Sequence, residues 1–337
     1  MSEQHHRKVA VIGAGSWGTA LALVAARNNH EVRLWARQRE VAQNINESHR
    51  NPFYLSDFEL PENLRATSLL EEAIDGVDFA IIVVPSHAMR EVMGSLRNHI
   101  REEMILVSAT KGVENGTLMR MSEVIKDALK DNFQPRLVAL SGPTFAREVS
   151  RQDPTAIVAA SSDKTWSEAI QRHLSSSSFR VYTNNDVAGV ELGGAVKNVV
   201  AIASGVVRGM GLGHNSIAAI ITRGLAEITR FAVLQGARRE TMAGLAGLGD
   251  LVLTCTGDLS RNRHVGVELG RGRTLDEILS EMREVAEGVK TTQAIYDLSR
   301  RLNAEMPITE SVYELLYQNK PASEALNELM SRPLKDE

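Results

Sequence analysis

Val9-Ala-Val-Ile-Gly13-Ala-Gly15-Ser-Trp-Gly18 is the stretch that decides the fold. It joins a predicted strand, Val9–Gly13, to a predicted helix, Trp17–Asn28, through the pattern G-x-G-x-x-G. Glycines at these positions permit a tight turn and let backbone N–H groups at a helix N-terminus approach a pyrophosphate. We therefore expect the turn to bind a dinucleotide. The alternative is a tight turn that binds no ligand.

Strand and helix patterns alternate through the first half of the chain. The predicted strands are short apolar runs: Val9–Gly13, Val32–Ala36, Phe79–Val84, Ile105–Thr110, Leu137–Leu140, Ala156–Ala159 and Arg180–Tyr182. The clearest helices between them are Trp17–Asn28, His87–His99, Leu118–Lys130 and Lys164–Leu174. Because these strands do not alternate polar and apolar residues, both faces of the sheet should be covered. The sequence predicts an α/β fold whose N-terminal domain, residues 1–186, is a Rossmann-type, doubly wound, mostly parallel sheet.

The pattern changes at Val187. From there we find helical patterns and glycine-rich turns but no convincing strand, which predicts an all-α domain over residues 187–337. Its longest apolar run, Val187–Val207, carries Glu191 and Lys197. Each charge would cost about 2.5–3.5 kcal/mol in a bilayer, so this run predicts a buried helix and not a membrane span.

Composition excludes several classes of protein. The formal charge of the 337 residues is 38 − 42 = −4, which argues against wholesale binding to nucleic acid or anionic membranes. No export signal is visible, and the single cysteine, Cys255, fits a reducing compartment, so we expect a cytoplasmic protein. Cys255 lacks an adjacent base or metal-type spacing, so it is interpreted as inert packing, and no metal site is predicted.

The end of the second strand bears on the choice of cofactor. An NAD-preferring site usually places a carboxylate there for the ribose 2′-hydroxyl. This chain has Leu34-Trp-Ala-Arg37-Gln-Arg39 instead. The two guanidinium groups could pair with a 2′-phosphate, which favours NADP(H) and leaves NAD(H) possible. The alternative is a pair of solvated surface arginines.

Two lysines and one aspartate stand out as candidate functional residues. Lys111 follows the apolar run Ile105–Thr110, where ligands of open α/β sheets bind, although a solvated lysine is equally compatible. Lys197 lies within an apolar helix, and a buried charge needs either a partner or a function. Glu191 is poorly placed to be that partner, whereas Asp250, in a glycine-rich turn, is a natural one. A structural ion pair remains the alternative to a catalytic lysine.

Seven motifs, in order along nearly the whole chain, then resemble one family. They are Gly13-Ala-Gly-Ser-Trp-Gly-Thr-Ala-Leu-Ala22, Thr110-Lys-Gly112, Leu140-Ser-Gly-Pro-Thr-Phe-Ala146, Glu191-Leu-Gly-Gly-Ala-Val-Lys-Asn198, Ile221-Thr-Arg-Gly-Leu-Ala-Glu227, Gly247-Leu-Gly-Asp250 and Ser260-Arg-Asn262. The chain resembles the bacterial NAD(P)-dependent glycerol-3-phosphate dehydrogenases of phospholipid synthesis. The set of motifs is far more specific than a lone glycine pattern.

The resemblance implies roles for individual residues. Lys197 matches the catalytic lysine of the family. The residues that match substrate contacts are Lys111, Gly142, Thr144, Lys197, Asp250, Ser260, Arg261 and Asn262. The residues expected to contact the cofactor are Gly13, Gly15, Ser16, Trp17, Gly18, Arg37, Lys111, Ala146, Arg261, Val285 and Glu287. The resemblance also implies a homodimer.

The expected activity is the interconversion of dihydroxyacetone phosphate and sn-glycerol 3-phosphate with NAD(P)H. Two other functions are compatible with the same topology. One is a two-domain Rossmann dehydrogenase that acts on a hydroxy acid. The other is a non-catalytic, redox-sensing NAD(P)-binding protein, in which a buried Lys197 would have no purpose.

Overall fold

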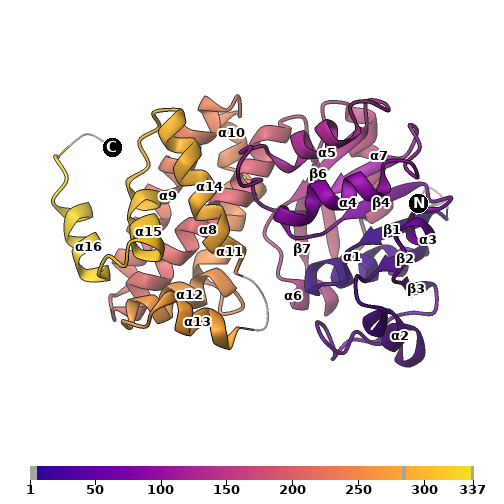
Figure 1. Ribbon diagram of the computed structural model, residues 1–337, viewed down its shortest axis with the longest axis horizontal. Helices are drawn as coiled ribbons and strands as arrows, with labels where there is room; N and C mark the ends of the chain where they lie inside the picture. The colour runs from indigo at the N-terminus through magenta and orange to yellow at the C-terminus, as the bar shows by residue number, and fades with distance from the viewer. Residues whose placement is uncertain (1–5, 283–285, 335–337) are drawn as a thin grey trace. The chain divides into compact units, whose positions relative to one another are not determined.

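The computed structural model describes residues 6–282 and 286–334 (Figure 1). Contacts group the chain into two compact units. One holds the residues up to Lys111 and Met119–Glu191, and the other holds Gly112–Leu118 and the residues from Leu192 onward. This division falls within a helix, α8 (Val187–Gly209), whereas the predicted domain boundary stands at its first residue. The boundary after residue 186 stays a prediction.

The first unit is built on one sheet of eight strands in the order β3-β2-β1-β4-β5-β6-β7-β8. Neighbouring strands are parallel except β6 and β7, which are antiparallel. The strands are β1 (Lys8–Ile12), β2 (Glu31–Trp35), β3 (Leu64–Thr67), β4 (Phe79–Ile82), β5 (Ile105–Ser108), β6 (Arg136–Ser141), β7 (Thr155–Ala160) and β8 (Phe179–Asn184). The predicted mostly parallel sheet is confirmed.

Helices cover both faces of this sheet (Figure 1). They are α1 (Ser16–Arg27), α2 (Arg39–Ser48), α3 (Leu70–Ile74), η1 (Ser86–Ala88), α4 (Met89–Leu96), α5 (Met121–Leu129), α6 (Ala146–Ser150) and α7 (Lys164–Leu174). Alternate residues of β1 enter different cores. Val9 and Val11 pack in the core that contains α1, while Ala10 and Ile12 pack in the core that contains α4 and α5. The doubly wound arrangement follows from this two-sided burial.

The second unit is helical. Besides most of α8 it contains α9 (His214–Leu234), α10 (Arg239–Met242), a π-helical turn η2 (Leu245–Gly249), α11 (Asp250–Thr256), α12 (Arg261–Gly270), α13 (Leu275–Glu281), α14 (Glu287–Arg301), α15 (Pro307–Tyr317) and α16 (Ala322–Met330). None of the described residues in the ranges 192–282 and 286–334 belongs to a strand. The predicted all-α character is confirmed.

Helix α8 is long and apolar enough to cross a membrane, but its most apolar 18-residue window is completely buried in the protein. Its backbone lies directly against that of α12. A Cβ at Gly205 would be 2.1 Å from the carbonyl oxygen of Arg263, and one at Gly209 would be 2.1 Å from that of Val267. Glycines therefore let the two helices approach to backbone contact, and the predicted buried helix is confirmed.

Candidate active site

The three glycines of the turn after β1 serve different structural purposes. Gly13 has a φ of +123°, and a Cβ there would be 2.3 Å from the carbonyl oxygen of Val83. A Cβ at Gly18 would be 1.8 Å from the carbonyl oxygen of Gly13. By contrast, no atom of the described residues, apart from the chain neighbours of Gly15, lies within 4 Å of a Cβ built on Gly15. Gly13 and Gly18 thus allow the turn to close, and Gly15 leaves space at the N-terminus of α1.

This N-terminus fits an anionic ligand. Its N-cap residue is Gly15, which has no side chain to cap the helix, and no acidic residue lies in the first turn. The first N–H groups of a helix have no intrahelical partner and favour negative charge. Beside them the Nε1 atom of Trp17 is buried and has no hydrogen-bond partner within the described residues. The pyrophosphate of a nicotinamide dinucleotide would supply acceptors for these donors.

The end of β2 lies beside the same turn. Ile12 and Trp35 are in register, and the N–H of Gly13 donates to the carbonyl oxygen of Trp35 at 3.1 Å. Two positions further, Arg37 is exposed, and so is Arg39 at the start of α2. The structure therefore brings a guanidinium group and the glycine turn to the same edge of the sheet, with no carboxylate between Trp35 and Arg39.

Lys111 and Gly142 meet at the carboxyl ends of β5 and β6. The Nζ atom of Lys111 donates to the carbonyl oxygen of Gly142 at 3.2 Å, and the hydroxyl of Thr144 donates to the same oxygen at 3.2 Å. Gly142 has little room for a side chain, because a Cβ would lie 3.1 Å from the Cα of Ile157. Ala146 begins α6 shortly after. Lys111, Gly142 and Thr144 thus form one group in the first unit.

In the second unit, Lys197 is buried and paired as the sequence predicts. Its Nζ atom forms an ion pair with the carboxylate of Asp250 and donates to the hydroxyl of Thr254 at 2.7 Å. The side chains of Lys197 and Asp250 are 7% and 0% exposed. Thr254 also donates to the backbone carbonyl of Asp250 at 2.6 Å. The ammonium group is therefore held by two oxygen ligands from one helix, α11.

A glycine on α8 explains how Lys197 reaches that helix. Gly193 is one helical turn before Lys197, so both residues lie on the same face. A Cβ on Gly193 would be 2.5 Å from the carbonyl oxygen of Ala246 in η2. Since η2 leads directly into Asp250, the close contact at Gly193 places the start of α11 within reach of Lys197.

Three of the predicted substrate contacts, Ser260, Arg261 and Asn262, lie at the start of α12, near Lys197. The hydroxyl of Ser260 accepts from the N–H of Arg263 at 3.2 Å and so caps the helix, and Arg261 is exposed. The Oδ1 atom of Asn262 accepts from the N–H of Gly288 at 2.9 Å. A Cβ on Gly288 would be 3.0 Å from the carbonyl oxygen of Asn198. Three segments of the second unit therefore meet beside Lys197.

Two predicted cofactor residues come from the segment before Gly288. Glu287 is half-buried and begins α14, next to the glycine that Asn262 contacts. Val285 lies outside the described residues. The first unit thus groups the glycine turn with Arg37 and groups Lys111 with Gly142, while the second groups Lys197 with Asp250 and Asn262.

Thr254 is a site residue that the sequence interpretation missed. It lies one turn after Asp250 on α11, so the spacing Asp250-x-x-x-Thr254 was the available signal for a shared face. Cys255, its neighbour, is buried, and burial raises the pKa of its thiol to about 12. Such a thiol is a poor nucleophile, which agrees with its interpretation as packing.

Glu191 contacts other residues than Lys197. Its carboxylate accepts from the guanidinium of Arg120 at 3.0 Å and from the backbone N–H and hydroxyl of Ser122 at 2.7 and 2.6 Å. Burial raises the pKa of Glu191, and the positive charge of Arg120 opposes this effect. Glu191 therefore anchors the start of α8 to the start of α5. The prediction that Glu191 is poorly placed to pair with Lys197 is confirmed.

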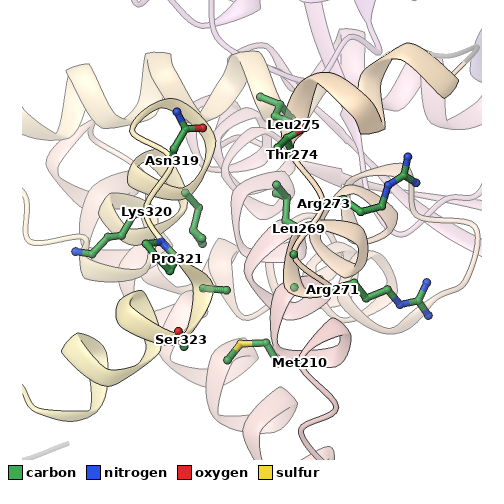
Figure 2. A pocket seen from close by; sticks show the side chains of 14 residues that line it. Met210, Leu269, Arg271, Arg273, Thr274, Leu275, Asn319, Lys320, Pro321 and Ser323 are labelled. Carbon is green, nitrogen blue, oxygen red and sulfur yellow. The ribbon is translucent and has the colours of Figure 1, made fainter.

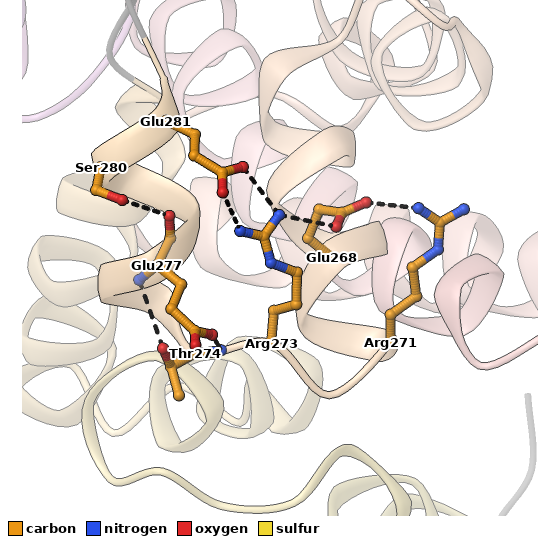
Figure 3. A network of polar contacts seen from close by, with 7 residues as sticks. All are labelled: Glu268, Arg271, Arg273, Thr274, Glu277, Ser280 and Glu281. Carbon is orange, nitrogen blue, oxygen red and sulfur yellow. Dashed lines mark hydrogen bonds and ion pairs between the residues drawn. The ribbon is translucent and has the colours of Figure 1, made fainter.

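An open groove of about 470 Å³ lies in the second unit, lined by the turns before α13 and α16 (Figure 2). Three cations border it, and each is already paired. Figure 3 shows Arg273 bonded to Glu268 and Glu281, and Arg271 bonded to Glu268 at 2.6 Å. Lys320 pairs with Glu314 at 2.9 Å. The groove therefore does not resemble an anion site. Thr274 and Glu277 form a capping box at its edge, at the start of α13.

Comparisons with known proteins agree with this geometry. Residues 8–167 match the model of the NAD-dependent glycerol-3-phosphate dehydrogenase N-terminus, and residues 186–327 match that of the C-terminus of the same enzymes. Between them the two matches cover most of the chain, including the glycine turn, Lys111 and Lys197.

Individual relatives are similar over almost their whole length. The chain is 54% identical to a glycerol-3-phosphate dehydrogenase [NAD(P)+] of Koribacter versatilis over 97% of both chains. It is 53% identical to that of Geobacter sulfurreducens over 98% of both. Among solved structures, glycerol-3-phosphate dehydrogenase of Coxiella burnetii is 39% identical, with a TM-score of 0.93, over 97% of this chain and 99% of the other.

Proposed function

The chain belongs to the NAD-dependent glycerol-3-phosphate dehydrogenase family, and on this premise we propose that it interconverts dihydroxyacetone phosphate and sn-glycerol 3-phosphate. It is an NAD(P)-dependent oxidoreductase, in which the bound nicotinamide supplies or accepts a hydride. The observation that carries the proposal is the buried pair of Lys197 and Asp250. An ammonium group is rarely held so far from water without a function.

The chemistry of the ketone explains what Lys197 does. Reduction of the carbonyl carbon leaves an oxygen that develops negative charge and must gain a proton. The Nζ atom of Lys197, when protonated, stabilises that charge and donates the proton, and in the reverse direction the neutral amine accepts it from the alcohol. A group fixed in a buried position needs little reorganisation when the charge appears, which is the main advantage of a preorganised donor.

Asp250 and Thr254 keep Lys197 ready for this step. The carboxylate of Asp250 offsets the cost of burying the ammonium, and the Thr254 hydroxyl fixes a second of its three N–H directions. Both residues therefore act on the orientation and charge of Lys197, and Lys197 itself transfers the proton.

We assign the substrate phosphate to Arg261 and Asn262, with Lys111, Gly142, Thr144 and Ser260 completing the substrate contacts. The guanidinium of Arg261 is exposed at the start of α12, where it can form two parallel hydrogen bonds to a phosphate. The cofactor contacts are assigned to Gly13, Gly15, Ser16, Trp17, Gly18, Arg37, Lys111, Ala146, Arg261, Val285 and Glu287. The open space at Gly15 and the unpartnered Nε1 atom of Trp17 support this assignment.

A preference for NADPH over NADH belongs to the same proposal. Arg37 is exposed just after β2. A dinucleotide whose pyrophosphate binds the glycine turn would place the 2′-phosphate of its ribose near this end of the strand. We further propose a cytoplasmic homodimer that supplies glycerol 3-phosphate for phospholipid synthesis. The similarity to bacterial relatives over nearly the whole chain supports this role.

Initial rates test the proposal directly. Purified protein should reduce dihydroxyacetone phosphate with NADPH and, more weakly, with NADH. Faster reduction of a keto acid would instead identify a hydroxy-acid dehydrogenase. Binding of NAD(P)H without turnover of any phosphorylated ketone would identify a redox-sensing protein and exclude the proposed reaction.

A further inference from the structure

Asn51 is a completely buried polar residue that contacts the glycine turn. It follows α2, whose C-cap residue, His49, is in a left-handed conformation with a φ of +50°. Its Nδ2 atom donates to the carbonyl oxygen of Ala14 at 2.9 Å and to the hydroxyl oxygen of Thr19 at 2.9 Å. Its Oδ1 atom accepts from the N–H of Phe53 at 3.3 Å. A single side chain thus connects the turn, α1 and the loop after α2.

The chemistry of the partners fixes which way the amide of Asn51 points. The carbonyl oxygen of Ala14 can only accept, so the side-chain nitrogen must face it. The backbone N–H of Phe53 can only donate, so the side-chain oxygen must face that. Asn51 and Thr19 are both 0% exposed, so bulk water cannot replace the hydrogen bonds that Asn51 donates to Ala14 and Thr19.

The bond to Ala14 determines where the next N–H points. In a trans peptide the C=O of one residue and the N–H of the following residue point in opposite directions. With the Ala14 oxygen held towards Asn51, the N–H of Gly15 must point away from it. Gly15 is the glycine with open space around it, and within the described part of the chain its N–H has no acceptor.

We propose that Asn51 is a positioning residue for the cofactor: it holds the Ala14–Gly15 peptide so that the Gly15 N–H is presented to the pyrophosphate. This inference rests on the proposed function, because it needs a dinucleotide at the turn. Asn51 touches no cofactor atom itself. Because NADH and NADPH share the pyrophosphate, loss of this positioning weakens both by the same factor, unlike a change at Arg37.

The test replaces Asn51 by Ala, which removes the donor, and by Asp, which places an acceptor against the Ala14 oxygen. Dissociation constants for NADH and NADPH are measured by calorimetric titration. A hydrogen bond to a charged group corresponds to about a ten- to hundredfold change in affinity. We expect such a loss for both cofactors in both variants, with kcat at saturating cofactor and the KM for dihydroxyacetone phosphate within about threefold of wild type.

Asn63→Ala and Asn63→Asp are the matched controls. The Nδ2 atom of Asn63 likewise donates to two backbone carbonyls, those of Ala26 and His30, both at 2.8 Å, in the same unit. These variants lose comparable hydrogen bonds but should keep wild-type affinity. Asn51→Ala with wild-type affinity, or Asn63 variants with an equal loss, would overturn the inference. Wild-type protein that binds neither nucleotide would instead overturn the proposed function. If Asn51→Asp does not fold, Asn51→Ala alone decides.

Discussion

Lys197 and Asp250 form an ion pair whose two side chains are 7% and 0% exposed, although 53 positions separate them in the sequence. Taking two charges out of water costs several kcal/mol per ion, and their attraction repays it only with good geometry and further hydrogen bonds. Thr254 supplies one such bond. Because a buried pair is weak evidence for stability by itself, its presence here favours the role in proton transfer that we propose for Lys197.

Lys197→Met should nearly abolish turnover, because methionine has a similar length but no proton to donate. Loss of a general acid lowers kcat by about 100- to 10,000-fold. Removing one partner of a buried pair also costs about 3–5 kcal/mol, so the thermal unfolding midpoint and the Kd for NADPH are measured together with the rate. The assay is run well below that midpoint.

The control for this variant is Lys164→Met on α7, whose side chain is 81% exposed and pairs only at the surface. It should leave the rate unchanged. A folded Lys197→Met variant that keeps most of the wild-type kcat would show that another group donates the proton.

Gly193→Ala should lower both stability and activity. Its Cβ would meet the carbonyl oxygen of Ala246 at 2.5 Å, so α8 and η2 must separate, and overpacking of this kind costs about 1–3 kcal/mol. The separation also moves Asp250 relative to Lys197, which should lower the activity. The free energy of unfolding is measured by chemical denaturation, and kcat is measured by initial rates.

Gly94→Ala provides the comparison, since Gly94 is exposed in α4 and a Cβ there would meet no atom within 4 Å among the described residues beyond its own helix. Alanine there should add up to about 1 kcal/mol of stability and leave kcat unchanged. If both variants behaved alike, close contact at Gly193 would not be what places the start of α11.

Sequence patterns predicted the central strands β1, β4, β5, β6 and β7 because these are nearly continuous apolar runs. They missed β3 (Leu64–Thr67), a four-residue strand at the edge of the sheet in which the buried Leu64 and Ala66 alternate with the exposed Arg65 and the half-buried Thr67. The pairing of Lys197 with Asp250 was predictable, since a charge in an apolar helix requires a partner. Asn51 was not, because its contacts with Ala14 and Thr19 join residues 37 and 32 positions apart with no periodic pattern.

Arg37→Asp should raise the KM for NADPH by about ten- to hundredfold and change that for NADH much less. A guanidinium pairs with a 2′-phosphate, whereas an aspartate repels it and accepts from a ribose hydroxyl. Initial rates with each cofactor at saturating dihydroxyacetone phosphate give the comparison. Arg39→Asp is measured in parallel. If Arg37→Asp raised the KM values for NADPH and NADH equally, Arg37 would not recognise the 2′-phosphate, and Arg39 would be the next candidate.

Arg261→Ala should lower kcat/KM for dihydroxyacetone phosphate by about ten- to hundredfold, because it removes a charge-assisted contact with the phosphate. Unphosphorylated dihydroxyacetone makes no such contact and should lose far less. NADPH is kept saturating, since Arg261 is also assigned to the cofactor. Arg263→Ala is the control on the same helix, because its guanidinium is bound to Asp258 at 2.9 Å. A proportional loss for both substrates in Arg261→Ala would place this residue at the cofactor alone.

Glu227 links two helices of the second unit through a buried carboxylate. On α9 it is 2% exposed, and it accepts from the N–H groups of Ile308 and Thr309, at 2.7 and 3.3 Å, at the start of α15. Burial raises the pKa of Glu227 to about 7 from 4.5, while the two N–H groups oppose the rise. The folded protein therefore binds this proton more tightly than the unfolded chain does.

The resulting stabilisation is complete below the unfolded pKa and is lost as the pH rises through the folded pKa. Between pH 5 and pH 8 the free energy of unfolding should fall by about 2 kcal/mol because of this group, since one pKa unit corresponds to about 1.4 kcal/mol. Glu227→Gln keeps an oxygen acceptor for Ile308 and removes the titration. The free energy of unfolding of both proteins is measured by urea denaturation across this pH range. In the difference between the two values at each pH, the contributions of the other titrating groups cancel. A difference that is independent of pH would show that Glu227 does not change its protonation in this interval.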